Sequence, residues 1–168
     1  MNFVKRKKGQ EGPMGMSFGV IFAIFLIIIF IFAAGFGIKK FLGYSKCNQI
    51  GMFYENLQRE VNDAFYAQSA ENKKLKISLP SSIKKVCFAN LSAPITYQGE
   101  EYDDISQFEF EEANVFLFPS DDACGLSYKK IEKLNIQKIT ERKNPYCVST
   151  DEELTFKKGI YDKYVIVE

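Results

Sequence analysis

Residues 17–38, SFGVIFAIFLIIIFIFAAGFGI, decide the architecture of this 168-residue chain. The stretch contains no charged residue, and most of its members are Ile or Phe. A helix rises about 1.5 Å per residue, so the stretch matches the roughly 30 Å hydrocarbon core of a bilayer. A helix at the surface of a soluble core is apolar along one stripe, whereas this one is apolar all round. The sequence therefore predicts a transmembrane helix over residues 17–38.

Basic residues on either side of this helix predict its orientation. The tail of residues 1–16 contains the run KRKK at residues 5–8, and three lysines lie between the helix and residue 47. Cytoplasmic flanks of membrane helices carry the excess of Lys and Arg, and four against three favours the N-terminal side. We therefore expect residues 1–16 to be a cytoplasmic tail and the C-terminal domain to be extracytoplasmic.

Cysteines and a glycosylation sequon point to the same orientation. All four cysteines follow the helix, and an even number on one side of a membrane predicts two disulfides in an oxidising compartment. Residues 90–92 read NLS, which makes Asn90 a candidate for glycosylation outside the cell. The alternatives are four buried free thiols or, less favoured because the chain has no C-x-x-C spacing, a zinc site. The disulfide candidates are Cys47, Cys87, Cys124 and Cys147.

Four cysteines allow three pairings. One plausible arrangement joins Cys124 to Cys147, which closes a short loop. It then joins Cys47 to Cys87, which would connect a helix to a sheet close to the membrane.

Residues 39–71 predict an amphipathic helix next to the membrane. Apolar side chains recur there at steps of three and four, which is typical of one buried helical face. No proline lies between Pro13 and Pro80, so this helix and the membrane helix can run nearly continuously, with a bend expected at Gly43 or Gly51. The apolar face consists of Ile50, Phe53, Tyr54, Leu57, Val61, Ala64 and Phe65.

Residues 72–168 predict a β-rich domain. Apolar and polar residues alternate at the start of this region, and Pro, Gly and Asn separate later apolar runs. The end of the chain predicts a hairpin around Gly159. We expect an α+β fold in which the helix of residues 39–71 packs on one face of a mostly antiparallel sheet of five or six strands. The expected strands cover residues 73–79, 83–88, 114–118, 134–139, 153–157 and 163–167.

Charge and composition narrow the function classes. Residues 1–46 carry seven Lys or Arg and one Glu, a net charge of +6, and the remaining fifteen basic and twenty acidic residues give −5. A domain with that charge and no basic stripe is a poor nucleic-acid binder. The chain has no His, the commonest general base and a frequent metal ligand. We found no catalytic motif and therefore predict no catalytic residue, no cofactor and no metal.

Residues 100–112 form the most acidic segment, with seven Asp or Glu. Several carboxylates can bind calcium, but their spacing fits no known calcium loop. We therefore interpret this segment as a solvated acidic surface. A cation-dependent binding module stays an alternative, and Asp121 and Asp122 would belong to it.

Two kinds of N-terminal processing compete with a permanent anchor. Residues 33–35, AAG, could serve as a signal-peptide cleavage site. Residues 7–10, KKGQ, resemble the junction at which archaeal type IV pilin precursors are cut. By that resemblance Gly9 would be the last residue removed and Gln10 the first retained. The chain departs from the pilin pattern in having Pro13 before the apolar run and Met14 where pilins carry an acidic residue.

The function that these observations favour is a single-pass, membrane-anchored, non-enzymatic structural or interaction protein. Its expected partners are the lipid bilayer and, in a second role, other membrane helices or copies of itself. The basic tail, the Phe/Ile-rich helix and the Lys-rich strands also resemble single-span surface proteins of archaea. The alternative, implied by the pilin resemblance, is a filament subunit that is processed after Gly9 and assembles through its hydrophobic helix.

Overall fold

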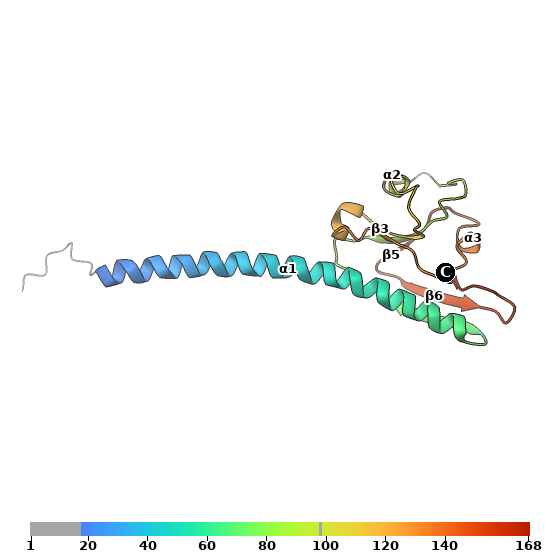
Figure 1. Ribbon diagram of the computed structural model, residues 1–168, viewed down its shortest axis with the longest axis horizontal. Coiled ribbons are helices and arrows are strands. Elements are labelled where there is room, and N and C mark those ends of the chain that lie inside the picture. Colours follow the sequence, from blue (N-terminus) through green and yellow to red (C-terminus); the bar gives the residue numbers. More distant parts are fainter. Residues whose placement is uncertain (1–17, 98) are drawn as a thin grey trace, which may run out of the picture. The chain divides into compact units, whose positions relative to one another are not determined.

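A computed structural model describes residues 18–97 and 99–168, and it leaves out the side chains of residues 71 and 72. The fold is α+β, with one long apolar helix near the N-terminus followed by antiparallel strands, as predicted (Figure 1). The chain divides into two units, residues 1–42 and residues 43–168, which are described separately.

Helix α1, Phe18–Tyr66, contributes to both units. Its residues up to Leu42 are all exposed, including every large apolar side chain among them. Among the described residues, α1 is the one helix long and apolar enough to cross a membrane by length and composition. The expected apolar helix is therefore present, and its described part covers Phe18–Tyr66.

The second part of α1 contributes one face to the core of the larger unit. Its helical turns continue through Gly51 and end at Tyr66, whereas we expected helix up to residue 71. The amphipathic face was predicted correctly except at Phe65, which is half-buried. The steps of three and four place these side chains on one side of the helix. The buried residues are Ile50, Phe53, Tyr54, Leu57, Val61 and Ala64.

The strands form two small sheets rather than the single sheet that we expected. The first has the order β1-β6-β7, and the second has the order β4-β3-β2-β5. All strand pairs within them are antiparallel. The period-two pattern identified strands but not their partners, because partner choice depends on contacts between distant segments. The strands are β1 (Ala70–Lys76), β2 (Lys85–Phe88), β3 (Val115–Phe118), β4 (Tyr128–Lys129), β5 (Tyr146–Ser149), β6 (Glu153–Lys158) and β7 (Ile166–Val167).

The four-stranded sheet is buried on both faces. Alternate residues of a strand point to opposite faces. Val86 and Phe88 of β2 belong to the main core together with the buried residues of α1. Cys87 belongs to a second, smaller cluster with Phe116 of β3 and Ile105 of the next helix. Residues 86–88 of β2 are therefore all apolar and buried, as expected for a central strand covered on both sides.

Two segments differ from the predicted secondary structure. Residues 100–106 form helix α2 (Glu100–Ser106), in a segment that we expected to be a solvated acidic surface and for which we predicted no helix. Residues 134–139, predicted as a strand, contain the short helix α3 (Ile136–Ile139). The strand prediction was wrong because Asn135 caps this helix, with its side chain accepting a hydrogen bond from the backbone N–H of Lys138.

Candidate functional site

All four cysteines form disulfides, but not in the arrangement that we favoured. The pairs are Cys47 with Cys124 and Cys87 with Cys147. The free-thiol and zinc alternatives are therefore wrong. Sheet register explains the second pair, because Cys87 of β2 lies directly opposite Cys147 of β5. The pairing that we favoured was based on loop length. Loop length contains no information about which strands are partners.

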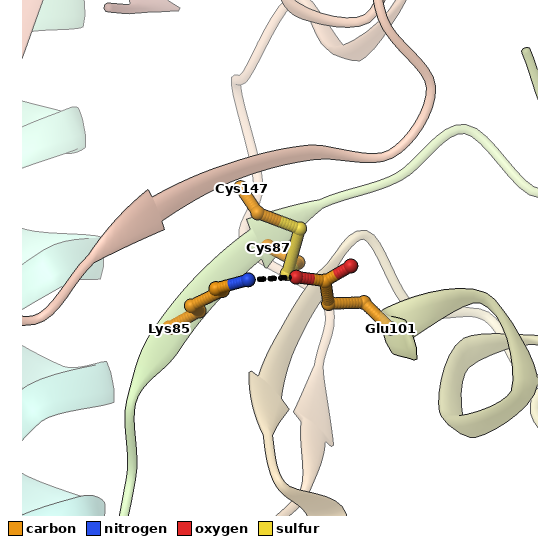
Figure 2. The surroundings of a disulfide bond; sticks show 4 residues. All are labelled: Lys85, Cys87, Glu101 and Cys147. Atoms are coloured by element: carbon orange, nitrogen blue, oxygen red, sulfur yellow. Dashed lines mark hydrogen bonds and ion pairs between the residues drawn. A yellow bond between two sulfur atoms is a disulfide. The ribbon is translucent and has the colours of Figure 1, made fainter. Parts of the chain in front are cut away.

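An ion pair lies beside the Cys87–Cys147 disulfide (Figure 2). Lys85 precedes Cys87 by two residues on β2, so both side chains point to the same face of the sheet. Glu101 comes from α2, and its carboxylate accepts a hydrogen bond from the Lys85 ammonium group. A side chain at Gly99 would approach the other carboxylate oxygen of Glu101 to 2.6 Å, so the glycine leaves room for it.

The pair couples a buried acid to a partly exposed base. The Glu101 side chain is 4% exposed and that of Lys85 is 42% exposed. Burial by itself raises the pKa of Glu101, but hydrogen bonds from Lys85 and from its own backbone amide outweigh burial, and the pKa falls below 4.5. The hydrogen bond to Glu101 raises the pKa of Lys85 above 10.5. Both groups are charged at neutral pH, so the pair acts as an electrostatic contact between α2 and β2.

The predicted solvated surface at residues 100–112 needs a correction at Glu101, which is buried. Asp104 also has a structural contact, because its carboxylate accepts the backbone N–H of Ser120 at 3.0 Å. The other acids of this segment lie exposed or half-exposed, as do Asp121 and Asp122. Within residues 18–97 and 99–168, no group of three or more His, Cys, Asp or Glu side chains could hold a metal ion.

The Cys47–Cys124 disulfide lies in a very different environment. Cys124 is exposed and follows the 3-10 helix η1 (Ser120–Ala123) in a left-handed backbone conformation, with φ 55°. Cys47 is half-buried on α1. Seven residues after Cys47 on α1, the hydroxyl of Tyr54 donates to the Leu126 carbonyl, two residues after Cys124, at 3.0 Å. This contact holds the turn after η1 against α1 and brings the two cysteines together.

The sequon asparagine Asn90 lies in a loop organised by Asn144. The Asn144 side chain accepts the backbone N–H of Asn90 at 3.0 Å and donates to the Asn90 carbonyl at 2.9 Å. The Asn90 side chain accepts the backbone N–H of Ser92 at 3.1 Å. A hollow of about 370 Å³ adjoins this loop. Sequence reasoning found Asn90 but not Asn144, because nothing in a lone asparagine indicates a buried role.

The structure therefore brings together the disulfide candidates in two pairs and leaves Asn90 in a separate loop. The processing candidates Gly9 and Gln10 lie outside the described residues. Helix α2 and the Lys85–Glu101 pair were not predicted. The acidic composition of residues 100–112 indicates exposure, so nothing in the sequence indicated that Glu101 is buried.

Comparison with known proteins gives no relative. No family model matches this chain, no curated protein matches it, and no solved structure matches its fold.

Proposed function

We propose that this chain is a single-pass membrane protein whose C-terminal domain serves as an anchored structural or interaction module. The observation that carries the proposal is the first part of α1. Its apolar side chains between Phe18 and Leu42 are all exposed, and the charged residues of that part are confined to Lys39 and Lys40 near its end. Such a surface is unfavourable in water and matches the interior of a bilayer.

The proposed orientation places the N-terminus in the cytoplasm. The KRKK run at residues 5–8 supports this side by the charge rule. Two disulfides in residues 43–168 support an oxidising compartment for the larger unit. The bilayer is then the first partner of the chain.

A non-enzymatic role is proposed for the larger unit. Among its described side chains, the most buried carboxylate is Glu101, which is already paired with Lys85 and is ionised at neutral pH, so it is poorly suited to exchange protons there. The other prominent polar residue, Asn144, is occupied by backbone hydrogen bonds. Both sites contribute to stability, which is what an interaction module requires of its scaffold.

Membrane fractionation and intact-mass measurement test this proposal. The full chain should stay in the membrane pellet after alkaline carbonate extraction. Its mass should rise by about four daltons on reduction, because each of two disulfides gains two hydrogens. Added protease should digest the domain from the extracytoplasmic side of sealed vesicles only. Release by carbonate, or digestion only from the cytoplasmic side, would contradict the anchor or its orientation.

The second candidate is a filament subunit that assembles through its hydrophobic helix, as the KKGQ junction suggests. The observation that favours it is α1 itself, because one helix carries both the exposed apolar residues and a face of the domain core. Helices of neighbouring subunits could then cover the residues that lipid covers in the first proposal.

Intact mass also separates the two candidates. A filament subunit requires cleavage between Gly9 and Gln10, so its mass would lack residues 1–9. A full-length mass from purified membranes would exclude processing and favour the permanent anchor.

A further inference from the structure

We propose that the Cys47–Cys124 disulfide is a thiol–disulfide exchange site for dithiols, whereas Cys87–Cys147 is a structural bond. This inference goes beyond the proposed function, because it assigns a covalent reaction to the larger unit. It rests on the different surroundings of two disulfides in the same domain.

Access distinguishes the two bonds. Cys124 is exposed, and the neighbouring Gly125 has open space around the position of a side chain. A thiolate must approach a sulfur atom directly to attack it, and the turn after η1 permits this approach. In contrast, Cys87 is fully buried, and Ile105 and Phe116 share its cluster.

The surrounding structure also determines what happens when each bond opens. Cys87 and Cys147 lie opposite each other in the β2–β5 ladder, so the strand pairing would hold their sulfur atoms close after reduction and favour re-formation of the bond. The segments joined by Cys47 and Cys124 keep a second contact, the hydrogen bond from Tyr54 to the Leu126 carbonyl. The Cys47–Cys124 bond can therefore open while the core persists.

Backbone conformation supports the same assignment. Cys124 occupies the left-handed region, which costs free energy in any residue with a side chain. Such residues cluster at functional sites. Among the described residues, positive φ angles occur only at Cys124, Gly125 and Lys133.

The reaction balances with a dithiol as reductant. One thiolate of the dithiol attacks the Cys124 sulfur, the disulfide bond breaks, and Cys47 leaves as a thiolate that takes a proton from water. The second thiol of the reagent then loses its proton and attacks the reagent's other sulfur, which is bonded to Cys124 in the mixed disulfide. This step releases the Cys124 thiolate for protonation. The chain gains two thiols, and the dithiol becomes a cyclic disulfide.

Timed alkylation tests this assignment on the full chain in detergent micelles. Dithiothreitol is the probe, N-ethylmaleimide traps new thiols, and peptide masses identify them. Cys47 and Cys124 should react at least about tenfold faster than Cys87 and Cys147, at a rate proportional to the dithiothreitol concentration. A monothiol, cysteamine, should leave its adduct on Cys124 rather than on Cys47.

A matched control is the Cys47→Ser, Cys124→Ser chain. It should remain folded by circular dichroism and show no trapped thiols during the time in which the wild-type pair reacts. Equal rates at both disulfides would overturn the proposal. A rate independent of dithiothreitol would also overturn it, because the opening would then require unfolding rather than direct attack.

Discussion

Lys85 of β2 and Glu101 of α2 form an ion pair between a strand and the short helix that also buries Ile105. Replacing Lys85 with Met should destabilise the domain by about 1–3 kcal/mol, because it leaves a buried carboxylate without its partner. The loss should stay below that of a fully buried pair, since Lys85 is 42% exposed. Urea unfolding at neutral pH measures this loss. The Lys85→Met, Glu101→Gln chain should recover part of it, and equal stability of the single variant and the wild type would contradict the role of the pair.

The same pair predicts a dependence on pH with a defined sign. Folding lowers the pKa of Glu101, so its contribution is present above pH 4.5 and is lost as the pH falls through the lowered value. Folding raises the pKa of Lys85, so its contribution is full below pH 10.5 and is lost as the pH rises through the raised value. In urea unfolding, the Lys85→Met chain should therefore lose less stability than the wild type between neutral and acidic pH.

Asn144 should be the most sensitive uncharged polar residue of the domain. It is 2% exposed, and its side chain bonds the backbone of Asn90 on both its N–H and its carbonyl side. Replacing it with Ala should cost about 2–4 kcal/mol, because each bond is worth about 1 kcal/mol and buried backbone groups lose their partners. Asn48→Ala is the control, since Asn48 lies exposed on α1. Similar thermal midpoints for the two variants would disprove this role.

Among the elements, the second part of α1 should contribute most to core stability. Leu57 is fully buried on this face, and its replacement by Ala should cost about 2–5 kcal/mol. Met52 on the same helix is half exposed, and its replacement should have little effect. Chemical denaturation of both variants would show whether the buried face of α1 is part of the cooperative core.

Membrane insertion of the first part of α1 should depend on the charge of a substituted side chain rather than on its volume. An Ile28→Arg substitution at the middle of the apolar stretch should disfavour membrane insertion by about 2.5–3.5 kcal/mol, whereas Ile28→Leu should be neutral. The fraction of protein in the carbonate-resistant pellet measures this difference. If both variants fractionate alike, the bilayer is not what surrounds this part of the helix.

The sequence predicted these elements with unequal success, for physical reasons. Period and length were sufficient for α1 because its apolar positions repeat over many turns. They also identified β3, which is wholly apolar and ends before Pro119. Helix α2 was not predicted because it has only seven residues, of which only Glu101 and Ile105 are buried. For α3, local capping by Asn135 prevailed over a weak apolar pattern.

At the scale of the whole molecule, the sequence predicted the α+β class but not the division into two sheets. The candidate site shows the same limit. Composition indicated that the four cysteines form two bonds, but their pairing depends on the β2–β5 register and on the contact between Tyr54 and Leu126. Both are interactions between segments far apart in sequence, which neither periodicity nor motif spacing encodes.

The order of the paired cysteines has a consequence for how the chain survives damage. The two bonds interlace along the sequence, since Cys87 lies between Cys47 and Cys124, and Cys124 lies between Cys87 and Cys147. Any single proteolytic nick between residues 47 and 147 therefore leaves both fragments covalently joined. In the pairing that we favoured from the sequence, Cys47 with Cys87 and Cys124 with Cys147, one cut between residues 87 and 124 would have separated the two fragments. Limited proteolysis followed by non-reducing electrophoresis should show nicked molecules migrating as one species, separating only after reduction. A protein built this way stays covalently in one piece even when its loops are cut.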